Sequence, residues 1–360
     1  MKLKKAIIFL SVLLQGILSS YGQKQIPVIH SHTNVVGIRD GKLLKAGFWN
    51  LDPSLKPDTY FVDLPRTNPK VTFITDRDSV SFDTRYGEVY DFVIVLNEKD
   101  SCYTRISANY NGVNNPAQIK AGIQADTIPF IMRNSRPYVV GKVNGHDQIY
   151  MMLDLGAGIT CVNINSVKKT GVTFDGSISV TNTNGTNAEP SSNHTRLQIG
   201  NLLWNDVQVV QVRNLADEDD IIIGNSLFRD RILEIDYDKK VLIIHPGSIE
   251  IPDGNTKHEV LYDQHRPKIK INLTIDGKTY EDWFLFDTGR DGTMLIGEDF
   301  TGEFDVWNGF ETLFMLGTKK IVVIPEVKIG GLIFKEIVTN ANDQGGTMFD
   351  QNKRIWIFFK

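Results

Sequence analysis

The sequence predicts a mainly β protein, in which an N-terminal antiparallel β domain is followed by a two-lobed β fold. Three observations support this prediction. Up to about residue 126, short apolar runs alternate with turn residues. From Pro137 onward, four blocks of sequence occur twice in the same order. In each copy, one apolar run ends in an aspartate that is followed by a glycine turn.

The first 22 residues have the layout of a secretory signal peptide. Lys2, Lys4 and Lys5 precede an apolar run at 6–14, and small residues follow it. A membrane span needs about 20 apolar residues, so a membrane anchor is the less favoured alternative. We therefore expect an exported protein (periplasmic, cell-surface or secreted) that has no membrane attachment once the signal is removed.

The composition argues against several classes of function. The chain has a formal net charge of −4, and without the three leader lysines it has 36 basic and 43 acidic residues, which gives −7. With no basic block, a nucleic-acid partner is not expected. The sequence contains no His-Glu-x-x-His helix, Gly-x-Ser-x-Gly elbow or phosphate loop, so a zinc protease, a serine hydrolase and a nucleotide-dependent enzyme have no support.

Residues 23–126 are predicted to form the N-terminal antiparallel β domain. Its apolar runs lie at 59–62, 71–74, 79–82 and 91–96. No residue pattern in this domain indicates chemistry. We expect it to pack against the second region or to present it, and a binding module is the less favoured alternative.

The repeat divides the rest of the chain into lobe one (137–247), a polar linker (248–264) and lobe two (265–360). The matching blocks are 139–145 with 269–277, 149–158 with 283–290, 197–207 with 327–337, and 235–243 with 349–357. Four blocks in one order indicate a duplication. Ile199 and Ile235 are 36 positions apart, whereas Ile329 and Phe349 are 20 apart, so lobe two is predicted to be about 16 residues short.

The two aspartate turns are candidates for an acid–base pair. Asp154 is followed by Leu155 and Gly156, and Asp287 by Thr288 and Gly289. Either turn alone would be read as an ordinary turn, because aspartate and glycine are favoured there. Since both occur at the same step of the repeat, the fold could bring the two carboxylates face to face. Such a pair shares one proton, so that one carboxyl is a base and the other an acid at the same pH.

These blocks resemble the retropepsin-like aspartic proteases, in particular exported bacterial members with two fused lobes, over residues 137–360. Asp287-Thr288-Gly289 matches the family's Asp-Thr/Ser-Gly signature, Asp154-Leu155-Gly156 matches it except at Leu155, and Ile222-Ile223-Gly224 matches the apolar segment that packs across the aspartate loop. The resemblance implies a pepsin/retropepsin-like β fold with the active cleft between the lobes. It also implies an aspartic endopeptidase in which Asp154 and Asp287 activate water with no cofactor and no metal. The implied partner is a peptide or protein substrate, and the fused lobes imply a monomer.

Members of the family close a flexible hairpin over the substrate, and two segments could supply it. One is 179–186, with Asn184 and Gly185 at its tip, and the other lies near 316–318. The residues to which the resemblance gives substrate- or loop-supporting roles are Gly156, Thr288, Gly289, Arg290, Asn184, Gly185 and Gly224.

Three departures from the family pattern bear on activity. Leu155 has no hydroxyl, so half of the clamp that joins the two loops is predicted to be missing. Arg290 stands where the family usually has a small residue, and a guanidinium pointing inward would lower the proton affinity of the pair. Lobe two is predicted to lack the apolar-Gly segment that braces the Asp287 loop.

Two other functions therefore stay open beside the active protease. One is a weakened or inactive relative that acts as a peptide-binding or scaffold module. The other is a glycosidase that uses the same two carboxyl groups, which would have to lie about 5 Å or more apart.

Three further features are interpreted as structural. The acidic run Asp217–Asp220 is predicted to be a solvated loop, with calcium binding as the less favoured alternative. His30 and His32 are predicted to be solvated rather than to bind a metal. Cys161 is expected to be a small core residue.

Overall fold

The structure is a computed structural model. It describes residues 26–41, 43–62, 70–85, 87–108, 118–119, 125–182, 185–213, 215–228, 231–245, 249–250, 257–263, 265–290, 294–317, 319–342, 348–349 and 355–358. The predicted signal peptide at 1–22 lies outside these ranges. No helix within them combines the length and the apolar character that crossing a membrane requires.

The fold is mainly β, as predicted, and its N-terminal part forms two sheets in the described residues. One has the strand order β1-β7-β8-β4 and the other β3-β2-β5-β6. The strands are β1 (Val28–Ser31), β2 (Val35–Asp40), β3 (Leu43–Asn50), β4 (Asp58–Phe61), β5 (Lys70–Ile74), β6 (Ser79–Asp83), β7 (Val89–Leu96) and β8 (Asp100–Ser107). Their pairings are antiparallel, except that β1 with β7 and β4 with β8 are parallel.

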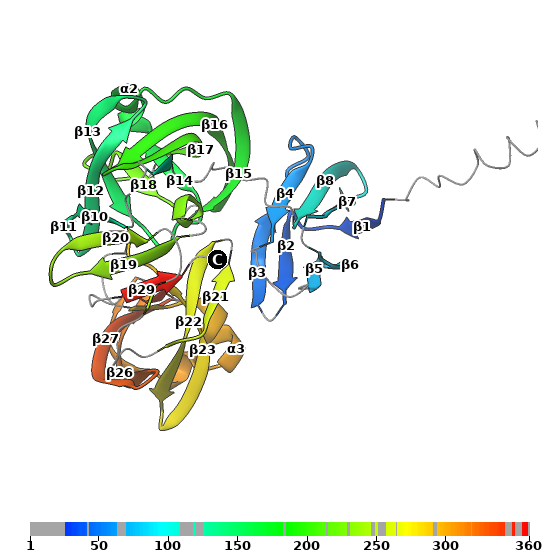
Figure 1. Cartoon of the computed structure of the whole chain (residues 1–360). Helices are drawn as coiled ribbons and strands as arrows, with labels where there is room; N and C mark the ends of the chain where they lie inside the picture. Colours follow the sequence, from blue (N-terminus) through cyan, green and yellow to red (C-terminus); the bar gives the residue numbers. More distant parts are fainter. Residues whose placement is uncertain are drawn as a thin grey trace, which may run out of the picture.

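The N-terminal strands enclose a core of their own. Buried and exposed side chains alternate along β2 and β5, as expected for strands with one face on a core. Trp49, Tyr60 and Phe73 meet edge to face in this core, with ring centroids 5.9–6.0 Å apart. The region lies to one side of the rest of the chain (Figure 1), where β4 contacts β15 (Gly176–Asn182) and β3 contacts β16 (Gly185–Ile199).

The two lobes have the same sheet topology in the described residues. The lobe-one order is β11-β12-β13-β18-β14-β17-β16-β15, and the lobe-two order is β21-β22-β23-β28-β24-β27-β26-β25. The remaining lobe-one strands are β11 (Ile131–Arg133), β12 (Arg136–Val143), β13 (His146–Leu153), β14 (Thr160–Asn163), β17 (Leu202–Val212) and β18 (Ile221–Ile223). The lobe-two strands are β21 (Val260–Asp263), β22 (Arg266–Ile275), β23 (Lys278–Phe286), β24 (Met294–Ile296), β25 (Glu311–Leu316), β26 (Lys319–Ile329), β27 (Leu332–Ala341) and β28 (Met348–Phe349). Position by position, the order supports the duplication read from the sequence.

Short helices follow equivalent strands in the two lobes. After β14 come η1 (Ile164–Ser166) and α2 (Val167–Thr170), and after β24 come α3 (Glu298–Phe304) and η3 (Trp307–Gly309). Lobe one has one further turn, η2 (Asn225–Phe228), directly after β18 and Gly224.

The prediction that lobe two lacks the apolar-Gly bracing segment is wrong for the strand, which is present as β28, although no glycine follows it. Strand β28 pairs in parallel with β23, with Phe286 opposite Phe349, just as β18 pairs with β13, with Leu153 opposite Ile223. It also pairs antiparallel with β24, as β18 does with β14. By sequence, Phe349 aligns with Ile235 of the final strand. A two-residue apolar strand with no following glycine is too short for its periodicity to reveal it.

The shortening of lobe two falls after the brace. In lobe one the chain continues into the hairpin of β19 (Ile232–Asp236) and β20 (Val241–His245). In the described part of lobe two it continues into β29 (Ile355–Phe358), which pairs with β19. A four-stranded sheet of order β10-β20-β19-β29 thus joins lobe one to the C-terminal segment (Figure 1), and its first strand is β10 (Asp126–Pro129).

Four strands that pair with strands of the lobes lie outside the predicted lobe boundaries, and one of them is β11, which precedes lobe one and pairs with β12. Strand β9 (Gln118–Ile119) pairs with β17, and β10 pairs with β20, although both begin within the predicted N-terminal domain. Strand β21 lies in the predicted linker and pairs with β22. The lobes therefore draw strands from the segments that precede them.

The prediction of a solvated loop at Asp217–Asp220 is wrong for its second half. Asp219 and Asp220 are 1% and 3% exposed. Asp219 accepts a hydrogen bond from the Tyr138 hydroxyl at 2.6 Å. Asp220 accepts hydrogen bonds from the Tyr150 backbone amide, at 2.9 Å, and the Ser166 hydroxyl, at 2.7 Å. Buried carboxylates that hold several donors fix local structure, so this run ties β18 to its neighbours.

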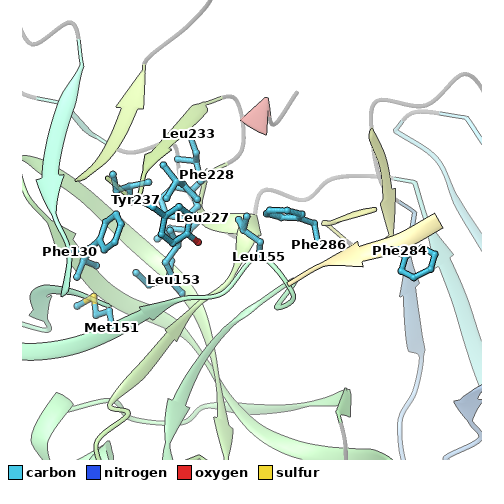
Figure 2. Packing of buried hydrophobic residues seen from close by; sticks show 14 of the residues in the cluster. Phe130, Met151, Leu153, Leu155, Leu227, Phe228, Leu233, Tyr237, Phe284 and Phe286 are labelled. Atoms are coloured by element: carbon cyan, nitrogen blue, oxygen red, sulfur yellow. The ribbon is translucent and has the colours of Figure 1, made fainter. Parts of the chain in front are cut away.

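One apolar cluster extends through both lobes. Its members from lobe one include Leu153, Leu155 and Leu227, and those from lobe two include Phe284 and Phe286 (Figure 2). Ile221, Ile222 and Ile223 are all buried, as expected of a β-branched run in a strand that is covered on both faces. The aspartate strands are therefore held from behind by a packed core.

Candidate active site

The two aspartates lie at equivalent strand ends. Asp154 directly follows β13, and Asp287 directly follows β23. The backbone amide of Asp154 donates to the Ile223 carbonyl oxygen at 3.4 Å, so β18 continues its parallel pairing up to the turn. Each carboxyl is thus placed where a buried strand leaves its sheet.

The two turns face each other so closely that only glycine fits beside each carboxyl. A Cβ atom built on Gly156 would lie 2.5 Å from Asp287 Cγ. A Cβ atom built on Gly289 would lie 2.3 Å from Asp154 Cγ. Both distances are below what real contacts show, so either added methyl group would push a carboxyl away. Since the two carboxyl groups also hydrogen-bond each other, the structure brings the predicted pair together.

Backbone amides hold both carboxyl groups. The Gly156 amide donates to Asp154 Oδ1 at 2.7 Å, and the Gly289 amide donates to Asp287 Oδ1 at 3.0 Å. The Gly289 amide also hydrogen-bonds Asp154 across the lobes. Both aspartates are partly exposed, whereas Leu155 and Thr288, the residues that follow them, are fully buried. The pair is therefore fixed from below and open to solvent on one side.

The pKa of Asp154 is raised well above its ordinary value. Burial is the main cause, followed by the negative charge of Asp287 and the hydrogen bond between the two carboxyl groups. The amides of Gly156 and Gly289 oppose this shift because they stabilise the ionised form. This is the behaviour of two carboxyl groups that share one proton.

Thr288 makes the only clamp that the signature residues of the two turns can provide, because Leu155 has no hydroxyl. The Thr288 hydroxyl donates to the Leu153 carbonyl oxygen at 2.8 Å and accepts from the Leu155 amide at 3.0 Å. The Leu155 side chain instead packs into the apolar cluster, together with Leu227 and Phe286 (Figure 2). The prediction that half of the clamp is missing, because Leu155 has no hydroxyl, is therefore confirmed.

Arg290 contributes to its own loop. Its Nη2 donates to the Met294 carbonyl oxygen at 2.7 Å, and the Thr339 hydroxyl donates to the same oxygen at 2.7 Å. The sequence suggested that an inward guanidinium would lower the proton affinity of the pair. The pKa of Asp154 is instead raised, for the reasons given above. The hydrogen bond from Arg290 to the Met294 carbonyl oxygen tethers the Asp287 turn to the start of β24.

Gly224 directly follows β18 and packs against the backbone of the loop that follows Asp154. A Cβ atom on it would lie 2.1 Å from the Ile159 carbonyl carbon, so no larger residue fits without moving the backbone. Cys161 is buried on the neighbouring strand, where burial and the charge of Asp154 raise its thiol pKa to about 12. Cys161 is thus an inert core residue, as the sequence suggested.

Both hairpin candidates are hairpins. β15 pairs with β16 up to Asn182 opposite Gly185, and β25 pairs with β26 up to Leu316 opposite Lys319. Asn184 and Thr318 at the two tips lie outside the described residues. Both hairpins therefore stay candidates for the one that closes over the aspartates.

Asn225 lies beside the Asp154 turn and was not identified from the sequence. Asn225 directly follows Gly224, and its Nδ2 donates to the Leu155 carbonyl oxygen at 2.6 Å. The available signal was a polar residue directly after a buried apolar run and a glycine. Such a residue is placed at the end of a core strand, where its side chain must find a partner.

Comparison with known proteins is consistent with this site. The family model described as gag-polyprotein putative aspartyl protease matches residues 139–230, a range that includes Asp154 and Gly224. No curated protein matches the chain. Among solved structures, the chain is similar to a retropepsin-like aspartic protease from Rickettsia conorii, with 21% identity and a TM-score of 0.26, over 36% of this chain and 95% of that one. It is also similar to an aspartic proteinase from Irpex lacteus, with 12% identity and a TM-score of 0.39, over 59% of this chain and 78% of that one.

The family-model match over residues 139–230 confirms the resemblance to aspartic proteases of this kind, and the described strands confirm a mainly β fold whose two lobes share one sheet topology. The family-model match supports a protease-type function.

Proposed function

We propose that the protein is an exported aspartic endopeptidase that hydrolyses peptide bonds through water activated by Asp154 and Asp287. The observation that carries this proposal is the approach of the two carboxyl groups, each seated against the glycine of the opposite turn. A single turn of this kind would be an ordinary structural feature. Here the carboxyl groups of two such turns share a hydrogen bond, and the pKa of Asp154 is raised. This geometry is suited to acid–base chemistry.

In the proposed reaction, the two carboxyl groups divide the chemistry. One carboxyl group of the pair keeps the shared proton and donates it toward the scissile carbonyl oxygen. The other accepts a proton from the attacking water. The amides of Gly156 and Gly289 keep the carboxyl groups in place while the charge moves. None of these steps draws on a metal or cofactor.

The test is cleavage of a broad peptide mixture between about pH 3 and 7 by the full chain and by Asp154→Asn and Asp287→Asn. Each substitution is expected to abolish cleavage, because the proposed hydrolysis needs both a general acid and a general base. Asp147→Asn is the matched control, since Asp147 is an exposed carboxylate of the same lobe that pairs with Lys142 at 2.6 Å. Cleavage that survives in both dyad variants, or that is lost equally in the control, would contradict the proposal.

A second candidate is a weakened relative that binds peptides without cutting them efficiently. The one-sided clamp at Leu155 favours it, because Thr288 alone supplies a side-chain hydroxyl between the two turns, and a second hydroxyl at position 155 is lacking. Saturable binding of a peptide with no cleavage at any pH in this range would support this candidate.

Export and a monomeric state are part of the proposal. The leader pattern at residues 1–22 supports export. Mass spectrometry of protein recovered from outside the cytoplasm should show that the leader has been removed, and recovery of the intact chain in the cytoplasm alone would contradict export. The presence of both aspartates in one chain supports a monomer, which sedimentation at micromolar concentration would test.

A further inference from the structure

Asn225 occupies a buried position at the back of the Asp154 turn. It is 1% exposed and begins η2, directly after β18 and Gly224. Its backbone amide donates to the Ala157 carbonyl oxygen at 2.9 Å, and its side-chain Nδ2 donates to the Leu155 carbonyl oxygen at 2.6 Å. One residue thus holds the turn on both sides of Gly156.

The chain reaches this position because of the two elements before it. Strand β18 runs parallel to β13, with Ile223 opposite Leu153, and so it ends beside the aspartate. Gly224 then passes within contact of the Ile159 backbone, where any Cβ would collide. The strand and the glycine together deliver the Asn225 carboxamide to the turn.

The Leu155 carbonyl is a sensitive place to hold, because it belongs to the same planar peptide unit as the Gly156 amide. That amide donates to Asp154 Oδ1 at 2.7 Å. Fixing the oxygen of a planar unit also fixes the direction of its N–H group. The Asn225 carboxamide therefore sets how the Gly156 amide points at the Asp154 carboxyl.

The preceding peptide unit is held by the opposite lobe. The Leu155 amide donates to the Thr288 hydroxyl at 3.0 Å. The two peptide units on either side of Leu155 thus have different anchors, Thr288 from lobe two and Asn225 from lobe one. Because Leu155 has no hydroxyl of its own, the anchor within lobe one supplements the half clamp.

The Oδ1 atom of Asn225 indicates that a contribution to stability alone does not explain an asparagine at this position. This oxygen is buried and has no hydrogen-bond partner among the residues that the structure describes. A buried acceptor that lacks a donor costs about 1–3 kcal/mol. An apolar residue of similar volume would avoid this cost but could not donate to the Leu155 carbonyl.

We propose that Asn225 is a positioning residue for Asp154, which acts through the Leu155–Gly156 peptide unit to keep the Gly156 amide aimed at the carboxyl group. The inference rests on the proposed function only for its effect on turnover. The Gly156 amide is one of the groups that hold down the pKa of Asp154 against burial and the charge of Asp287. Loosening that amide should raise the pKa of Asp154 further.

The test is a titration of the full chain labelled with ¹³C at the aspartate carboxyl carbons, followed by NMR between pH 3 and 8. The Asp154 signal is assigned by its loss in Asp154→Asn. In Asn225→Ala we expect the apparent pKa of Asp154 to rise by about half a unit or more, because a directed hydrogen bond to the ionised form is weakened. Asn225→Leu keeps the volume of the side chain and should give the same shift if the alanine variant does not fold.

Asn163→Ala is the matched control. Asn163 is a fully buried asparagine of the same lobe, and its Nδ2 donates to the carbonyl oxygens of Ala216 and Asp219, both at 2.9 Å. Its loss should lower the unfolding midpoint without moving the Asp154 titration. A merely structural role for Asn225 predicts the same pattern, so an unmoved titration in a folded Asn225 variant would overturn the proposal.

Kinetics separate this inference from the proposed function. If the wild-type chain cleaves peptides, Asn225→Ala should lower kcat about tenfold and leave KM within about twofold, because the carboxyl is misdirected while the substrate contacts remain. If the wild-type chain cleaves nothing but the titration shifts, the protease proposal fails and the positioning role stands. If cleavage occurs and the titration is unmoved, the positioning role fails alone.

Discussion

Replacing Thr288 by valine tests how much its hydroxyl stabilises the contact between the two aspartate turns. Valine keeps the shape of threonine, so no cavity should form at this fully buried position. The change removes the donor to the Leu153 carbonyl oxygen, at 2.8 Å, and the acceptor of the Leu155 amide, at 3.0 Å. A buried polar group that loses its partner costs about 1–3 kcal/mol, so the Leu153 carbonyl and the Leu155 amide together predict a loss of about 2–6 kcal/mol.

The assay is urea unfolding of the full chain followed by circular dichroism, with the transition of the lobes fitted separately from that of the N-terminal part. Thr170→Val is the matched control. Thr170 is also fully buried, but its hydroxyl donates within its own lobe, to the Ser166 carbonyl oxygen at 2.9 Å. Thr288→Ser keeps the hydroxyl and should lose only about 1 kcal/mol for the missing methyl group. If Thr288→Val costs no more than Thr170→Val, the hydrogen bonds of Thr288 across the lobes add no more stability than those within one lobe, and the reasoning is refuted.

Three further changes give distinct outcomes. Leu155→Thr should lower the free energy of unfolding by about 1–3 kcal/mol, since Leu155 is fully buried in the shared core, and an unchanged denaturation midpoint would contradict this. Gly289→Ala should abolish peptide cleavage because its Cβ would lie 2.3 Å from Asp154 Cγ, whereas Gly331→Ala, with no atom within 4 Å, should leave cleavage unchanged. Burial raises the pKa of Asp58 to about 7, so between about pH 4 and 7 the folded state keeps a proton that the unfolded chain has released, and stability should fall as the pH rises. Asp58→Asn should flatten this decline, which at about 1.4 kcal/mol per pH unit over about three units is at most about 4 kcal/mol in the N-terminal transition, and an unaltered pH dependence would refute it.

Much of the site could be predicted from the sequence because its signals are local. An apolar run that ends in Asp-x-Gly identifies a strand and a turn without reference to the rest of the chain. The occurrence of two such turns at the same step of a repeat identifies Asp154 and Asp287 as a pair. The one-sided clamp follows from a single residue type, since Leu155 carries no hydroxyl.

Other features depend on contacts that no local pattern reports. Strand β28 has two residues, and its membership of the sheet follows only from its pairing with β23 and β24. Asp219 and Asp220 look solvated in the sequence, yet donors from β12, β13 and η1 bury them. In both cases the deciding partners are far away along the chain.

The sequence by itself determined the β class, the duplication and the identity of the two aspartates, because side-chain periodicity and residue type are properties of short segments. The tertiary structure alone decided that the carboxyl groups share a hydrogen bond, that Met348–Phe349 braces lobe two and that Asn225 holds the Leu155 carbonyl. These features depend on distances between segments that lie up to 133 positions apart, as Leu155 and Thr288 do. Hydrogen bonds and steric exclusion act over a few ångströms, so only the folded chain brings such groups within their range.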